Sequence, residues 1–175
     1  MGGDSFPILR QVVLDTTDAR ALAEFYRGLL GYEYRPGDDA PPPGEDDTRG
    51  RDWLVLVHPS GASRVAFQQV DALPHSTWPD TAVPQQSHLD LTVPSEAELA
   101  RQHARALGLG ARMLLDRSDD PVEPLYVYAD PEGHPFCIFV VPDCSPFGVG
   151  PPARRTSTAV KILAFGFTTG QAEIC

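Results

Sequence analysis

The 175-residue sequence has little cysteine and lacks any long hydrophobic run. Its three cysteines are an odd number with no Cys-x-x-Cys spacing, which argues against a disulfide framework and against a zinc site built on cysteine. The sequence contains no run of ~18 apolar residues, the length that could span a membrane. Its first residues lack the basic segment and apolar core of a secretory signal. We therefore expect a cytoplasmic protein whose thiols are reduced.

Basic residues are also scarce. Lysine and arginine total 14 against 24 aspartates and glutamates, so the formal net charge is −10. Because an acidic surface gains nothing from meeting another polyanion, nucleic acids and anionic membranes are excluded as partners. The common catalytic signatures His-Glu-x-x-His, Gly-x-Gly-x-x-Gly, the phosphate-binding loop and Gly-x-Ser-x-Gly are absent. The expected partner is a small molecule.

Proline, in contrast, is abundant, with 18 residues that cluster at 36–43 and 142–152. Segment 36–51 is acidic and rich in glycine and proline, so we expect a flexible loop that is either a tolerated surface insertion or the cover of a cavity. The tail, 143–175, regains apolar character at 159–167. That piece is either disordered or a strand that docks on the domain or on a neighbouring protomer.

The sequence contains an internal repeat. Residues 11–15 align with 88–92 at an offset of 77, and the same offset matches Gly31 with Gly108. Further along, 55–61 align with 127–133 at an offset of 72. Two degenerate copies of one structural unit are therefore predicted.

Each copy begins with alternating apolar and polar residues, a period typical of a strand with one buried face. Helices follow, the first marked by an apolar stripe from Leu22 to Leu30 that Gly31 ends, and the second by a Ser95-x-x-Glu98 capping box and a stop at Gly108. Three strands then close each unit, at 32–35, 53–58 and 63–69 in the first copy and at 111–115, 125–129 and 135–141 in the second. The predicted fold is α+β, with two tandem βαβββ modules, 7–70 and 86–142, within one domain at 7–142.

Two segments resemble a known superfamily. The run from Val13 to Gly31 (VLDTTDARALAEFYRGLLG) and the closing motif Asp130 to Cys137 (DPEGHPFC) are similar to the vicinal oxygen chelate superfamily of glyoxalase I, bleomycin-resistance proteins and extradiol dioxygenases. Trp78-Pro-Asp and Gln85-Gln-Ser-His-Leu-Asp-Leu resemble its actinobacterial glyoxalase-like domain branch. The resemblance implies a cup-shaped, partly closed mixed β-sheet barrel with helices outside, a central cavity, and a homodimer.

The resemblance also implies metal positions in the first and last strand of each module. They fall on Gln11, His88 and Cys137, and on Val65 or a neighbour up to Gln68. A hard divalent ion prefers carboxylates and imidazoles, and no carboxylate stands at these positions. We therefore expect no catalytic metal cofactor; in the alternative, a divalent metal has His88 as its surest ligand.

Side chains alternate between the two faces of a strand, so His88 and Asp90, two residues apart, lie on the same face. Either they satisfy each other in a partly wet cavity, or His88 acts as hydrogen-bond partner or general base toward a ligand. Cys137 lies in an apolar run without an adjacent base, which favours an inert buried thiol over a nucleophile. The aromatic residues either belong to the core or line a pocket.

The favoured function is a small-molecule-binding protein in the manner of bleomycin-resistance proteins. The alternative is an enzyme of the lyase, isomerase or dioxygenase type, with His88 as the best catalytic candidate. The residues expected to contact the ligand are Gln11, Trp53, Gln68, Trp78, His88, Asp90, Tyr126 and Cys137.

Overall fold

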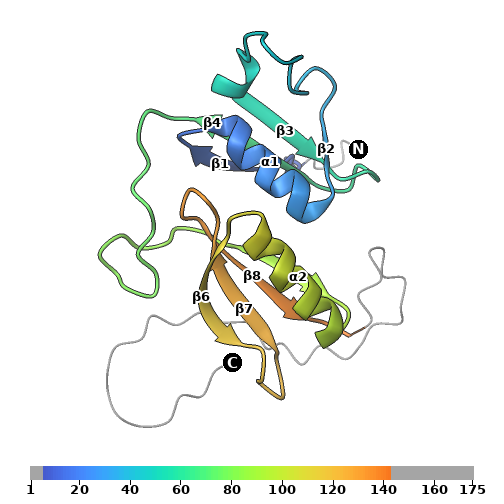
Figure 1. Cartoon of the computed structure of the whole chain (residues 1–175), viewed down its shortest axis with the longest axis vertical. Coiled ribbons are helices and arrows are strands. Elements are labelled where there is room, and N and C mark those ends of the chain that lie inside the picture. Colours follow the sequence, from blue (N-terminus) through green and yellow to red (C-terminus); the bar gives the residue numbers. More distant parts are fainter. Residues whose placement is uncertain (1–5, 143–175) are drawn as a thin grey trace, which may run out of the picture.

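The computed structural model describes residues 6–142, which form two βαβββ modules in tandem (Figure 1). The first module contains β1 (Val12–Thr16), α1 (Ala19–Leu30), β2 (Glu33–Tyr34), the 3-10 turn η1 (Arg49–Arg51), β3 (Trp53–Val57) and β4 (Arg64–Gln69). The second contains β5 (Leu89–Val93), α2 (Glu96–Gly108), β6 (Arg112–Arg117), β7 (Leu125–Ala129) and β8 (Pro135–Val140). The predicted α+β class and module pattern are confirmed, whereas the predicted roles of the tail lie outside the described residues.

Both modules build a four-stranded sheet with the same connectivity. The strand orders are β1-β4-β3-β2 and β5-β8-β7-β6, and in each sheet the first strand runs parallel to the last while the other pairs are antiparallel. The two sheets stay separate within residues 6–142, so they form open halves of a cup and not a closed barrel. None of the helices in this range is both long and apolar enough to cross a bilayer.

Side chains and glycine set the ends of the two helices. The Asp18 carboxylate accepts a hydrogen bond from the Ala21 amide at the start of α1, and Gly31 ends it in the predicted left-handed conformation, with φ of 66°. The Ser95 hydroxyl caps α2 as predicted, but Glu98 turns to Arg101 and Gln102 instead of completing the capping box. α2 ends at Gly108, as predicted, and Leu109 follows as its C-cap.

One hydrophobic core joins the modules through their helix-covered faces. The Phe25 and Tyr26 rings of α1 lie 6.0 Å and 6.4 Å, centroid to centroid, from Phe136 of β8. Both helices contact each other and lie on the same side of the two sheets (Figure 1). Burying each such aromatic ring stabilises the fold by about 1.5–3 kcal/mol. Each sheet therefore keeps a second face, here called its helix-free face, outside this shared core.

A buried carboxylate fixes the β7–β8 turn against α1. Asp130, 3% exposed, accepts hydrogen bonds from the Tyr26 hydroxyl, from His134 Nδ1 and from the main-chain amides of Glu132 and His134, all at 2.9 Å. Glu132 in turn accepts hydrogen bonds from the amide and hydroxyl of Thr17. We call these five residues the intermodule clamp. The motif that resembles the superfamily thus forms the joint between the two modules.

The acidic loop 36–51 is held in place by its own carboxylates, which corrects the expectation of a flexible loop. Asp38 is fully buried, accepts a hydrogen bond from the Val55 amide at 2.9 Å and pairs with Arg35 at 2.9 Å. Arg20 of α1 holds Asp47 at 2.8 Å. These contacts fasten the loop to α1 and to β3.

Removing the Tyr26 hydroxyl should destabilise the fold. Tyr26→Phe keeps the buried ring but takes one donor from a buried carboxylate, so we expect the free energy of unfolding to fall by about 1.5–3 kcal/mol. Urea denaturation measures the change. Tyr32→Phe, which removes a hydroxyl that pairs with Ser63 at the surface, is the matched control, and an equal loss in both variants would contradict the clamp.

Candidate functional site

A row of polar side chains lies on the helix-free face of the second sheet. Asp90 of β5 is the register partner of Cys137 of β8, and the Cys137 thiol donates a hydrogen bond to Asp90 Oδ1 at 2.8 Å. His88 Nε2 lies 3.3 Å from the same oxygen. Asp90 is exposed, His88 is half-buried and Cys137 is buried. The structure therefore brings together three of the residues predicted from the sequence.

Apolar side chains surround this row. Leu125, Val127 and Cys137 form a small buried cluster, against which Leu114, Phe139 and Trp78 pack. Trp78 comes from the connection between the modules, whereas the other members belong to the second sheet. A fourth predicted residue thus joins the row, as an apolar wall beside the polar groups.

The Cys137 thiol is neutral in this environment. Burial raises its pKa well above the usual range, and the hydrogen bond to Asp90 and the negative charges of Asp90 and Glu123 raise it further. A protonated thiol is a poor nucleophile and a poor metal ligand. Cys137 therefore acts as a hydrogen-bond donor that positions Asp90.

The donor set does not fit the hard divalent metal that the superfamily resemblance implies. Cys137 at one implied position offers a soft sulfur atom, which a hard ion disfavours, and Gln11 is a weak neutral ligand. At the corresponding place in the first module, Val13 pairs with Ala66, which has no donor atom in its side chain. Nowhere in residues 6–142 do three or more His, Cys, Asp or Glu side chains gather as metal ligands would.

The remaining residues predicted on the first module lie on the other sheet. Gln68 is the register partner of both Asp15 in β1 and Trp53 in β3, so these three share one helix-free face, and Gln11 directly precedes β1. Val65 lies on the opposite, helix-covered face. Ala66, and not Val65, is therefore the counterpart of Cys137.

Tyr126 corrects the expectation that it lies with the ligand-binding residues. Alternation along β7 turns Leu125 and Val127 to the helix-free face and Tyr126 to the helix-covered face. There its ring stacks on His103 of α2, with 4.1 Å between the centroids. Tyr126 therefore contributes to the core under α2.

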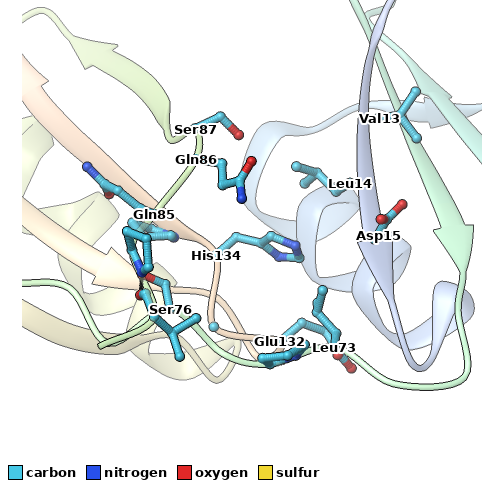
Figure 2. Close-up of a pocket in the computed structure, with 15 residues that line it drawn as sticks. Val13, Leu14, Asp15, Leu73, Ser76, Gln85, Gln86, Ser87, Glu132 and His134 are labelled. Carbon is cyan, nitrogen blue, oxygen red and sulfur yellow. Dashed lines mark hydrogen bonds between the residues drawn. The ribbon is translucent and has the colours of Figure 1, made fainter. Parts of the chain in front are cut away.

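A cavity of about 470 Å³ lies between the modules, and none of the residues predicted to contact the ligand lines it (Figure 2). Its walls come from β1, from both ends of the connection between the modules, and from the β7–β8 turn. Figure 2 shows the His134 ring extending from that turn toward β1, which carries Asp15. The lining residues are Val13, Leu14, Asp15, Leu73, Pro74, Ser76, Val83, Pro84, Gln85, Gln86, Ser87, Glu132, Gly133, His134 and Pro135.

His134 is the titratable centre of this cavity. Burial by itself lowers its pKa, but the hydrogen bond and charge of Asp130, with the charges of Glu132 and Asp15, outweigh burial and raise the pKa above its ordinary value. His134 was not among the residues predicted for the site. Its spacing of four residues from Asp130 was the available signal for a paired imidazole.

Comparison with known proteins gives a family and a fold. The model of the glyoxalase-like domain family matches residues 11–139. No curated protein matches the chain. A glyoxalase/bleomycin resistance protein/dioxygenase family enzyme from Burkholderia phytofirmans PsJN is similar in structure, with 16% identity, a TM-score of 0.55, and coverage of 75% of this chain and 97% of that chain. The fosfomycin resistance protein FosX from Listeria monocytogenes is also similar in structure, with 15% identity, a TM-score of 0.56, and coverage of 78% of this chain and 95% of that chain. Identities this low support the fold alone.

Protonation of His134 should stabilise the protein. Because its pKa is raised in the folded state, its contribution is fully present below the unfolded-state pKa and is lost as the pH rises through the folded-state pKa. We expect the free energy of unfolding to fall as the pH rises above the ordinary imidazole pKa of about 6.5, and His134→Gln to flatten this decline. Urea titrations at a series of pH values test it; an unchanged slope in the variant would refute the assignment.

Proposed function

The chain belongs to the glyoxalase-like domain family, and on this premise we propose that it binds a small organic molecule on the helix-free face of its second sheet. The proposal needs no catalytic metal. The ligand contacts are His88 and Asp90 as polar anchors and Trp78 as an apolar wall.

One observation carries this proposal: the polar row lies partly exposed beside a cluster of apolar side chains. Small-molecule sites are mainly apolar and contain a few placed polar groups that fix orientation. Asp90 accepts the hydrogen bond of the Cys137 thiol with one oxygen, Oδ1, and its exposed carboxylate retains further acceptor capacity toward a ligand. The indole of Trp78 offers a flat surface for a planar or alkyl group.

Structures with this fold give general support. A mutant of the Listeria monocytogenes FosX protein is described in complex with Mn(II) and a dihydroxypropylphosphonic acid. That protein therefore holds a small organic acid together with a metal. In our chain the donor set differs, so we propose the small-molecule role without the metal.

A second candidate function is catalysis on the same face. His88 and Asp90 form an imidazole–carboxylate pair with 3.3 Å between Nε2 and Oδ1, an arrangement that suits a general base. The class of enzyme would be the lyase, isomerase or dioxygenase type of the superfamily. Turnover of a bound compound separates this candidate from the simple binder.

We further propose that two copies of the chain associate along β1. This strand forms an edge of its sheet, and Val12 and Val13 on it are exposed. The apolar residues that precede it are more exposed still, with Ile8 at 91%. An exposed apolar edge strand is a template for pairing with another chain, since its main-chain groups lack partners on one side.

Ligand binding can be followed by the fluorescence of Trp78. The sequence has two tryptophans, so Trp53→Phe leaves Trp78 as the sole reporter. Screening this variant against a panel of metabolites and antibiotics should yield a compound that changes Trp78 emission. Asp90→Asn in the same background should weaken binding of that compound about 10-fold or more, because it removes a charged hydrogen-bond acceptor.

Glu33→Gln, which changes an exposed carboxylate on β2 in the same way, is the control and should leave the affinity unchanged. Equal affinity in the Asp90 variant would contradict the proposed site. If the compound is turned over and His88→Ala abolishes turnover while binding persists, the catalytic candidate replaces the simple binder.

The association along β1 predicts a homodimer in solution. Light scattering coupled to gel filtration should give about twice the chain mass of 19.0 kDa. Ile8→Asp with Val13→Asp should shift the protein to monomer, because charges on an edge oppose strand pairing. A monomeric natural protein, or a dimer that the charges leave intact, would refute this interface.

A further inference from the structure

The cavity between the modules is distinct from the polar row on the helix-free face. None of His88, Asp90 and Cys137 lines it. Its walls instead combine Asp15 of β1 with the β7–β8 turn of the other module and with Gln86 and Ser87 (Figure 2). With a volume of about 470 Å³ it has the size of a small-molecule site.

The charged groups that line this cavity are Asp15, Glu132 and His134. Neither lysine nor arginine is among its lining residues within 6–142. The imidazole of His134 pairs with the buried carboxylate of Asp130. Protonated His134 pairs with Asp130 and also interacts electrostatically with Glu132 and Asp15. Three carboxylates against one imidazolium still leave the cavity wall with a net negative charge.

Asp15 is the group most available to a ligand. Its side chain is exposed, and its charge acts on His134, but no side-chain hydrogen bond or ion pair of Asp15 is found among residues 6–142. Glu132, by contrast, already accepts the amide and hydroxyl of Thr17. A cation that enters the cavity therefore finds one free carboxylate and a second, fixed one nearby, in a chain whose net charge of −10 attracts it.

The uncharged residues of the lining suit the alkyl chain and the ammonium group of an organic amine. Leu73, Val83 and Pro74 supply apolar contacts for methylene groups, and Gln86 and Ser87 supply hydrogen-bond acceptors for an ammonium group. An anionic ligand would be repelled by Asp15 and Glu132, and the cationic group of the lining, protonated His134, is already paired with Asp130. A neutral ligand would gain nothing from the carboxylates beyond a hydrogen bond.

We infer that this cavity is a second binding site, which takes a small organic amine in its cationic form, with Asp15 as the principal counter-charge. The bound amine contacts β1 of the first module and the β7–β8 turn of the second. Its binding therefore stabilises the joint between them, because a ligand that binds only the folded arrangement shifts the equilibrium toward it.

The test compares three probes of equal chain length by isothermal titration calorimetry on the full chain: pentane-1,5-diamine, pentane-1,5-diol and glutarate. The diamine should bind, and the diol and the dicarboxylate should not. Asp15→Asn should weaken the diamine about 10-fold, since one ion pair is lost. Asp15 is exposed, so the variant should fold, and its thermal unfolding verifies this.

Asp90→Asn is the matched control and should leave the affinity for the diamine unchanged. The inference is overturned if the diol binds as tightly as the diamine, if no diamine binding is detected up to ~10 mM, or if Asp15→Asn has no effect. A diamine that responds to Asp90→Asn but not to Asp15→Asn would sit on the helix-free face, which would overturn the second site and leave the proposed function standing.

Discussion

The arrangement of the two modules depends on how the chain satisfies the Asp130 carboxylate. Moving an ionised carboxylate from water into the protein interior costs several kcal/mol if no donor replaces the water. Its burial is therefore tolerated only with a full set of hydrogen-bond donors. Three donors come from its own turn, and the fourth is the hydroxyl of Tyr26 on α1. Since the fourth belongs to the other module, satisfying one charge also fixes where the modules meet. The core around Phe136 and the cavity beside His134 both follow from that placement.

The elements of the fold were predictable because their signals are local. Alternating residues indicate a single strand, the apolar stripe before Gly31 indicates a single helix, and the repeat indicates two copies of one unit. The structure confirms all three. The ungapped alignment failed by one position at Val65. The turn between β3 and β4 is one residue longer than the turn between β7 and β8, and a shift of one residue reverses the face of every side chain in a strand.

The site could be predicted in part, for a related reason. His88, Asp90 and Cys137 lie on paired strands, so the pairing implied by the repeat brings them together. Trp78 reaches them from the connection between the modules, where no periodicity exists to predict its position. The cavity was missed because its walls come from three segments far apart in the chain. The buried Asp38 was missed because a loop of acidic composition ordinarily indicates exposure.

Asp38 has a further effect on the first sheet. Its carboxylate takes the Val55 amide, a main-chain donor at the β2 side of β3 that a further strand would otherwise use. β2 itself is two residues long. The two edges of the first sheet therefore differ: the β2 edge is short and the Val55 amide beside it is already occupied, whereas β1 is a five-residue edge with exposed valines. An added strand would find more main-chain partners along β1 than along β2, so the sheet favours growth at one edge over the other.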